Sequence, residues 1–425
     1  MLNRRSFIAS SAAALGAAAF SGRSAYAQAG LTLDFTGWNY DNDLVNAIMR
    51  EFEAQNPGTT VAFTADPAGQ YNQKLLARFI GGDSPDALFT REETMSDWAE
   101  SGFIRPLTEF DGLKELVETV KPNSRNSMTY KGEIWALPYY TDHIAFMYNA
   151  DLLDKAGISA PPTTWDELLA QSKKIMAAGL LPHPLVVPMK GNSALYWWAA
   201  IYGMGGGLFD ETGAPRFGSG PSDSLRLLEF LVDAGKQGVL DQASLQMGSP
   251  ELRQAFMAGQ VAFAPAPRFD LKLFNDPGKS TVAGNVKQML FPGFDAGGPH
   301  GTLGWTHLYS VAAKTDHAEA AWNLIRHISS PASQKRLYLR NGVGYSYAAL
   351  DTDAEIAAET NRWSDQTIAV RQGESAKPRE TLAYVWGTEW EINHMEQVQE
   401  AIVGRKTPAE ALEASAATAR RLNGG

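Results

Sequence analysis

The sequence predicts an α/β protein organised in two domains. Along the first hundred residues after the leader, short alternating segments typical of strands are separated by segments whose apolar residues recur at helical spacing. That order predicts a parallel, doubly wound sheet. Beyond an N-terminal leader of 27 residues, 425 − 27 = 398 residues remain, enough for two domains whose cores need no disulfide, and the chain contains no cysteine.

Residues 1–27 are expected to be an export signal. Arg4 and Arg5 precede an Ala-rich apolar run at 9–20, and Ala25-Tyr26-Ala27 forms a small-x-small site, so cleavage is expected after Ala27. The adjacent arginines favour the twin-arginine route over an ordinary secretory signal. No later segment reaches the ~18 apolar residues of a membrane span. We therefore expect a soluble protein of the periplasm.

The net charge of the chain excludes some classes of binding partner. The formal net charge is −10, and the leader contributes three arginines and no acid, so the mature chain carries −10 − 3 = −13. A surface for nucleic acid or anionic lipid needs an excess of Lys and Arg, and this chain has the opposite balance. A small ligand remains open, because the field inside a site is local.

Three strand–helix pairs are expected at the start of the mature chain. The strands are expected at 31–36, 59–63 and 85–89, and the helices at 44–52, 75–80 and 95–101. The loops at 37–43, 64–70 and 90–94 follow the carboxyl ends of these strands. Ligands bind beyond such strand ends in doubly wound sheets.

The later elements are marked by turns and caps. Two strands, 133–138 and 143–148, are expected on either side of a tyrosine-rich corner at 139–142. Two helices close the chain, the second opening with Thr407 as N-cap, Pro408 at the first helical position and Glu410 three residues on, which is a capping box. The remaining expected elements are helices at 222–234, 249–259 and from 316, and strands at 261–264 and 304–312.

Five short motifs lie in the same order as in one known family. They are DSPDALF at 83–89, WAESGFI at 98–104, YNADLL at 148–153, PTTWDEL at 162–168 and FMAGQVAF at 256–263. With the C-terminal helix pair and the export signal, they resemble extracellular solute-binding proteins, family 1, the maltose-binding-protein-like receptors of ABC importers. The similarity covers nearly the whole mature chain.

The resemblance implies a type II periplasmic-binding-protein fold, with two α/β lobes of doubly wound sheets joined by a hinge. Lobe 1 would comprise 30–140 and 290–330, and lobe 2 would comprise 145–285 and 345–425. The hinge crossings would lie near 138–144, 290–294 and 341–344. The implied partners are a sugar and the permease subunits of an ABC transporter, with a monomeric chain and no cofactor.

Candidate ligand residues follow from matching the family's binding segments. Aromatic faces cover the C–H faces of a sugar ring, and planar polar groups bond its hydroxyls. Thr90 replaces a stacking Trp of the family, so the ligand need not be a maltodextrin. The candidates are Trp38, Asn39, Tyr40, Glu93, Thr94, Asp142, Trp197, Arg268, Phe269, Trp305 and Tyr384.

Several candidates have a second interpretation. Trp197 and Trp198 are adjacent, so on a helix at least one of them is expected in the core. Asp142 fits a structural hinge partner as well as a ligand contact. Arg268 fits a surface salt bridge, or a bidentate contact to an acidic sugar if it faces the cleft, and Arg91 and Arg379 raise the same possibility.

The sequence lacks the residues that most kinds of enzymatic catalysis require. The sequence has no cysteine, no G-x-S-x-G nucleophile motif and no H-E-x-x-H, and none of its seven histidines forms a metal spacing. A glycosidase needs only two carboxylates, and Asp142 with Glu93 would be the candidate pair. The sequence therefore predicts a periplasmic receptor for a mono- or oligosaccharide, glycoside or polyol, with a secreted carbohydrate-active enzyme as the alternative.

Overall fold

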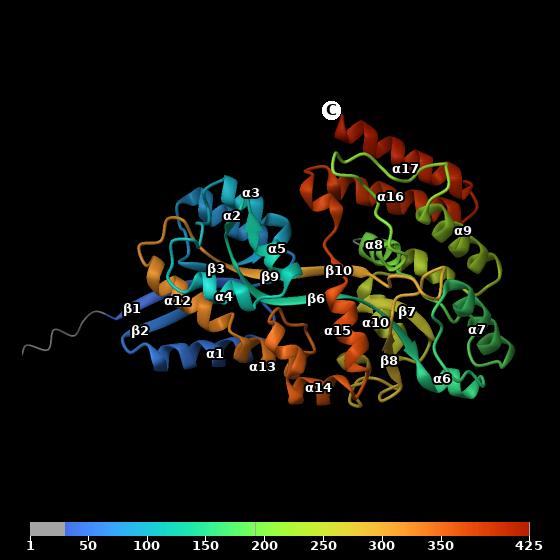
Figure 1. Ribbon diagram of the computed structural model, residues 1–425, viewed down its shortest axis with the longest axis horizontal. Helices are drawn as coiled ribbons and strands as arrows, with labels where there is room; N and C mark the ends of the chain where they lie inside the picture. The colour runs from blue at the N-terminus through green and yellow to red at the C-terminus, as the bar shows by residue number, and fades with distance from the viewer. Residues whose placement is uncertain (1–29, 192, 425) are drawn as a thin grey trace, which may run out of the picture.

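Figure 1 shows the computed structural model, which describes residues 30–191 and 193–424. The expected export signal and its cleavage site lie outside these residues. Two α/β lobes lie side by side, and strands β6 and β9 run from one to the other (Figure 1). The prediction of a two-lobed α/β fold is confirmed. Within the described ranges, no helix is long and apolar enough to cross a membrane.

The first lobe is built on a mixed sheet whose first three strands are parallel to one another. Strand β1 (Leu31–Trp38) lies between β2 (Thr59–Asp66) and β3 (Ala87–Arg91) and pairs in parallel with both. The main path of the eight-stranded sheet has the order β2-β1-β3-β9-β6-β7, and two further strands pair with β9 and β6 beside this path. The loops after β1, β2 and β3 therefore leave the same edge of the sheet. The helices of this lobe are α1 (Asn42–Gln55), α2 (Tyr71–Gly81), α3 (Glu92–Glu100), α4 (Leu113–Thr119), α5 (Pro122–Met128), α12 (Ala318–Ile328), α13 (Pro331–Asn341) and α14 (Ala354–Thr360).

Strand β6 is one of the two strands that run between the lobes. β6 (Leu137–Asn149) pairs through its first half with β9 (Thr302–Val311), and through its second half with β7 (Phe263–Pro267) and β8 (Val286–Met289). The prediction of a tyrosine-rich corner at 139–142 is wrong, because these residues continue the strand. The register shifts between Pro138 and Tyr140, and this bulge accommodates the missing N–H of proline inside the ladder.

The second lobe surrounds the far half of β6. Strand β10 (Ala376–Lys377) pairs with the start of β9. In the first lobe, β4 (Thr129–Tyr130) and β5 (Glu133–Ile134) form a separate two-stranded hairpin. The helices of the second lobe are α6 (Ala150–Lys155), α7 (Trp165–Ala177), α8 (Ala194–Gly203), α9 (Asp223–Lys236), α10 (Ser249–Met257), α11 (Asp270–Phe274), α15 (Gln366–Glu374), α16 (Gly387–Ile402) and α17 (Pro408–Asn423), with 3₁₀ turns η1 (Gln242–Gln246) and η3 (Glu380–Ala383). The 3₁₀ turn η2 (Ala348–Thr352) packs on the first lobe.

Each lobe has its own hydrophobic core. The first core contains Phe35 and Trp322, and it continues through Tyr347 to Ile356, so residues expected in lobe 2 pack with the first lobe. The second core contains Trp165 and Trp390. Separate cores leave the two lobes free to move as units about the segments that join them.

The C-terminal helices confirm the capping prediction. The Thr407 side chain accepts the Glu410 N–H, and Glu410 Oε2 accepts the Thr407 N–H at 2.8 Å. This reciprocal cap satisfies two N–H groups that the first turn of α17 would leave unpaired. Helices α16 and α17 pack on each other and on α9, as their places at the upper right of Figure 1 indicate.

Candidate functional site: the cleft between the lobes

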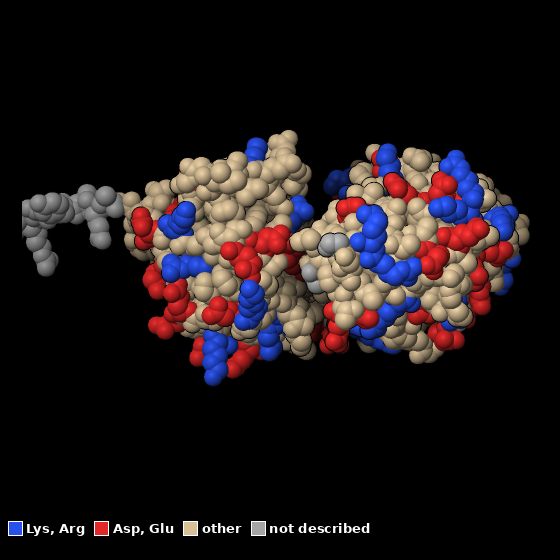
Figure 2. Space-filling view, turned by 90° about the horizontal axis from the view of Figure 1, so that it is seen from above, with Lys and Arg blue, Asp and Glu red and all other residues tan. Residues whose placement is uncertain are grey.

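An open cleft of about 520 Å³ lies between the lobes. Figure 2 shows the lobes as two masses divided by a notch. The strand-end loop of β1 forms one wall, and α10, α11 and the segment before α11 form the other. The lining residues used below are Trp38, Asn39, Tyr40, Tyr140, Arg253, Phe269, Asp270, Lys272, Asp276, Lys279, Arg340 and Asn341.

Aromatic rings dominate the wall from the first lobe. The Trp38 ring packs against Phe89 with centroids 4.1 Å apart and meets His307 edge-on at 4.5 Å. The ring centroids of Tyr40 and Tyr140 lie 6.0 Å apart. Trp38 and Tyr40 are only partly buried, so each keeps apolar surface toward the cleft. Half-exposed rings held by neighbouring rings are suited to stack on a sugar.

The loop after β1 is held rigidly by Asp41. This residue adopts the left-handed conformation at φ 46°, and its side chain caps α1 by accepting the Leu44 N–H. Its other oxygen bonds Arg340 at 2.7 Å and Asn341 at 2.8 Å. Asp41 therefore ties the loop that carries Trp38 and Tyr40 to the end of α13.

The four cations that line the cleft are paired with carboxylates of the chain, whereas Arg91, whose guanidinium lies 4.7 Å from the centre of the Trp38 ring, donates to the Ala68 carbonyl. Arg253 pairs with Asp270 at 2.8 Å, and Arg340 pairs with Asp41. The two lysines also form ion pairs. Lys272 pairs with Glu359 at 2.8 Å, and Lys279 pairs with Asp276 at 3.1 Å. One oxygen of Asp270, a residue that lines the cleft, is buried without a partner among the described residues.

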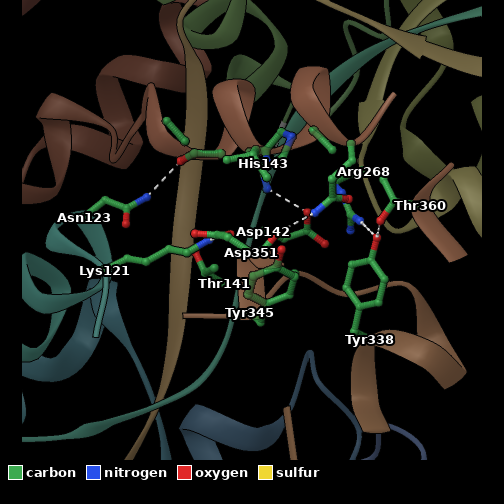
Figure 3. A pocket seen from close by; sticks show the side chains of 16 residues that line it. Lys121, Asn123, Thr141, Asp142, His143, Arg268, Tyr338, Tyr345, Asp351 and Thr360 are labelled. Carbon is green, nitrogen blue, oxygen red and sulfur yellow. Dashed lines mark hydrogen bonds and ion pairs between the residues drawn. The ribbon is translucent and has the colours of Figure 1, made fainter. Parts of the chain in front are cut away.

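Asp142 and Arg268 lie together where β6 crosses, in a smaller cavity next to the cleft (Figure 3). Arg268 is buried, and its guanidinium donates to the Gly342 carbonyl at 2.6 Å and to the Tyr338 hydroxyl. A surface salt bridge is therefore not its role. Burial raises the pKa of Asp142 to about 7, partly offset by Arg268. Asp142 Oδ1 accepts the His143 N–H, while Oδ2 is buried and unpaired among the described atoms.

The first turn of α3, directly after β3, carries two acids. Glu93 pairs with Arg379 Nη2 at 3.0 Å, and the Thr94 hydroxyl turns back to the Arg91 carbonyl at 3.3 Å. Glu92 points inward and accepts the Thr306 N–H and the Ser127 hydroxyl, each at 2.9 Å. Burial, and then the neighbouring Glu93, raise the pKa of Glu92 to about 8.

The remaining candidates lie away from the cleft lining. Trp197 is 4% exposed and packs on His394 in the second core, because α8 is buried on all sides. Tyr384 stacks on Trp386 at 4.7 Å, and its hydroxyl points to the Asp210 carbonyl. Trp305 is half-buried on β9 opposite Asp142 and packs toward the second core.

The cleft brings together Trp38, Asn39, Tyr40 and Phe269 from the predicted set. Sequence reasoning missed Tyr140, Arg253, Asp270 and Asn341. Two signals were present: Asp270 directly follows Arg268-Phe269, and Asn341 opens a predicted crossing segment. Glu92 was also missed, although it adjoins Glu93 at a strand end.

Comparisons with known proteins agree with this architecture. A model of the family described as bacterial extracellular solute-binding protein matches residues 37–335. A curated protein of Brucella abortus (strain 2308), named as a binding protein, is 26% identical over 288 residues, which are 65% of this chain and 66% of that protein. The chain thus spans just under two thirds of the length of this relative.

Two solved structures share the fold over most of the chain. The maltose-bound MalE3 protein of T. maritima has a TM-score of 0.77 at 22% identity and covers 92% of this chain and 100% of its own. An ABC transporter solute-binding protein of Agrobacterium vitis S4, with bound D-mannitol, has a TM-score of 0.70 at 21% identity, over 92% and 97%. The family and both neighbours are binding proteins, so the enzyme alternative has no support.

Proposed function

The chain belongs to the family of bacterial extracellular solute-binding proteins, and from that premise we propose that it binds a neutral sugar or polyol between its lobes for an ABC importer. The observation that carries the proposal is the cleft itself, in which half-exposed Trp38, Tyr40 and Phe269 face polar groups whose charges are already paired. Aromatic faces with a few fixed polar groups are the usual lining of such ligand sites.

A neutral ligand fits the ion pairs better than an acidic one. An acidic sugar needs a cation that is free to bond its carboxylate, and the cleft cations Arg253, Arg340, Lys272 and Lys279 each hold a carboxylate of the chain. Arg268 is committed to Gly342 and Tyr338. Replacing these bonds with bonds to a ligand would leave buried acids such as Asp270 unpaired, which is costly.

The proposed mechanism is binding coupled to hinge closure. A ligand that touches Trp38 and Tyr40 on one lobe and Phe269 on the other has higher affinity for the closed arrangement, and this difference shifts the population toward closure. The closed form would then dock on the permease. Export to the periplasm and a monomeric state complete the proposal.

A thermal-shift screen tests this function. The chain from Gln28 is heated with neutral sugars, polyols, acidic sugars and amino acids, and each ligand that shifts the midpoint is recovered and analysed. A ligand at 100 times its dissociation constant adds about 2.7 kcal/mol, which moves the midpoint by several degrees. Trp38→Ala serves as the binding-deficient comparison.

The outcomes separate the alternatives. A shift with a neutral sugar or polyol that is recovered unchanged supports the proposal. A shift confined to acidic sugars refutes the neutral ligand, and a shift confined to amino acids refutes the sugar class. A sugar recovered cleaved would restore the glycosidase.

A further inference from the structure

One arginine of the second lobe bonds carboxylates on both lobes. Arg379 Nη1 lies 2.9 Å from Glu391 Oε2, and Arg379 Nη2 lies 3.0 Å from Glu93 Oε1. Glu391 is on α16 in the second lobe, whereas Glu93 is in the first turn of α3 in the first lobe. The Arg379–Glu93 pair therefore joins the lobes.

The segment that carries Arg379 is fixed in the second lobe on either side of it. The Pro378 carbonyl accepts the Tyr202 hydroxyl of α8 at 2.8 Å. The Glu380 carboxylate accepts two backbone N–H groups, those of residues 208 and 209, at 2.9 and 2.7 Å. These bonds anchor the backbone from which the Arg379 side chain extends.

Glu391 holds the guanidinium from behind. Its other oxygen accepts the Trp198 indole N–H at 3.1 Å and the Thr381 hydroxyl at 2.7 Å, so Glu391 itself has little freedom. The Arg379 side chain is 16% exposed, and the Glu391 side chain 6%. A shielded arginine held by one carboxylate is presented in a defined direction to a second one.

The carboxylate that receives Arg379 stands at the edge of the sheet facing the other lobe. Glu93 follows β3, and its Oε2 is buried without a partner among the described residues. Glu92, next to it, is turned to Thr306 and Ser127 and leaves Glu93 as the acid available to Arg379. The pair is 30% exposed on the Glu93 side, so it is less screened than an open surface pair.

We propose that Arg379 is a positioning residue that holds the lobes at a defined separation through Glu93. That separation sets how the walls of the cleft meet a ligand, so Arg379 would act on affinity without touching the ligand. The effect on ligand affinity rests on the proposed function above. The lobe separation itself needs no ligand, and its measurement stands even if every sugar fails to bind.

The test measures the distance between the lobes by double electron–electron resonance in ligand-free protein. The chain has no cysteine, so spin labels attach only at Ser101→Cys in the first lobe and Lys173→Cys in the second. Glu93→Gln is the main variant, because it removes the cross-lobe ion pair and leaves the Arg379–Glu391 pair intact. Arg379→Gln, the double variant and Arg379→Lys complete the series.

The matched control is Arg78→Gln. Arg78 also bridges two carboxylates, Asp34 and Asp83, but all three residues belong to the first lobe. Its removal should leave the distance distribution as in the parent protein. Circular dichroism and the melting temperature establish that each variant is folded.

The expected result is a shift to longer distances in Glu93→Gln and Arg379→Gln, with no further shift in the double variant. Arg379→Lys, which keeps the charge, should recover part of the parent distribution. Distances in Glu93→Gln that coincide with those of the parent would overturn the proposal. Single shifts that add in the double variant would also overturn it, because the two residues would then act separately.

Discussion

Glu92 offers a direct test of how burial controls charge at the candidate site. Its carboxylate lies inside the first lobe, bonded to Thr306 and Ser127 and adjacent to Glu93. Glu92→Gln keeps the shape and an oxygen that accepts both bonds, and it removes only the ability to ionise. The substitution therefore isolates the effect of the buried charge.

The magnitude follows from the raised pKa. Burial brings the pKa of Glu92 from 4.5 to about 8, so the folded chain binds a proton that the unfolded chain has released between these values. The contribution of this group to stability is full below pH 4.5 and is lost as the pH rises through 8. At 1.36 kcal/mol per tenfold change in proton affinity, a rise of the pKa from 4.5 to about 8 corresponds to a loss of stability on the order of several kcal/mol above pH 8.

Melting curves of parent and Glu92→Gln at pH 5 and pH 9 measure this effect. The variant should melt close to the parent at pH 5 and several degrees higher at pH 9, since 1 kcal/mol moves the midpoint of a domain this size by ~2–4 °C. Burial also raises the pKa of Asp142 and of Asp270 into this window. Both groups titrate in the parent and in the variant, so their effects cancel in the difference between the two melting temperatures. Equal melting differences at the two pH values would refute the reasoning.

The control is Glu109→Gln. Glu109 is half exposed and pairs with Arg105 at 2.7 Å on the surface of the same lobe. An exposed pair of this kind contributes about 0.2–1 kcal/mol. Its removal should shift the midpoint little, and by the same amount at both pH values.

Four further predictions concern binding and stability. Trp38→Ala should weaken sugar binding by about 1–3 kcal/mol in calorimetry, and an unchanged affinity would remove Trp38 from the site. Trp197→Ala should destabilise the chain by about 3–5 kcal/mol in denaturant while sparing ligand affinity, since the ring is buried in the second core, and a selective loss of binding would contradict that placement. Asp142→Asn should raise the melting temperature more at pH 9 than at pH 5, because the raised pKa of about 7 makes the ionised form unfavourable, and a pH-independent effect would show that Asp142 stays ionised. Thr407→Ala should lower the unfolding free energy by about 1 kcal/mol through loss of the cap, and no change would mean that α17 draws nothing from it.

Much of the fold could be predicted because its signals are local. The alternation of β1 and β2 and the apolar face of α1 are readable within ~15 residues, and they appear in the structure at nearly the expected bounds. The Thr407 cap needs only its own first turn. The corner expected at 139–142 failed because proline and adjacent tyrosines resemble a turn locally, whereas pairing with β9 keeps them in a strand.

The candidate site was predictable only in part. Trp38 ends β1 and Asn39 and Tyr40 follow it directly, so their place at the sheet edge follows from chain order alone. Trp197 and Trp38 are the same residue type, and no local feature says that one is core and the other is cleft. That distinction depends on which elements pack against each ring.

The sequence by itself therefore determined the order of the elements, the α/β class, the ends of the helices and the strand ends beside which Trp38 and Glu93 lie, while the two-lobed arrangement was expected only from the resemblance to a family. These properties depend on periodicity and caps, which act between neighbours in the chain. Only the tertiary structure decided that Arg379 meets Glu93 across the lobes, 286 residues away, that the cleft cations are paired, and that Glu92 is buried enough to hold its proton. Ion pairing and desolvation depend on distance and burial in space, which chain spacing does not encode.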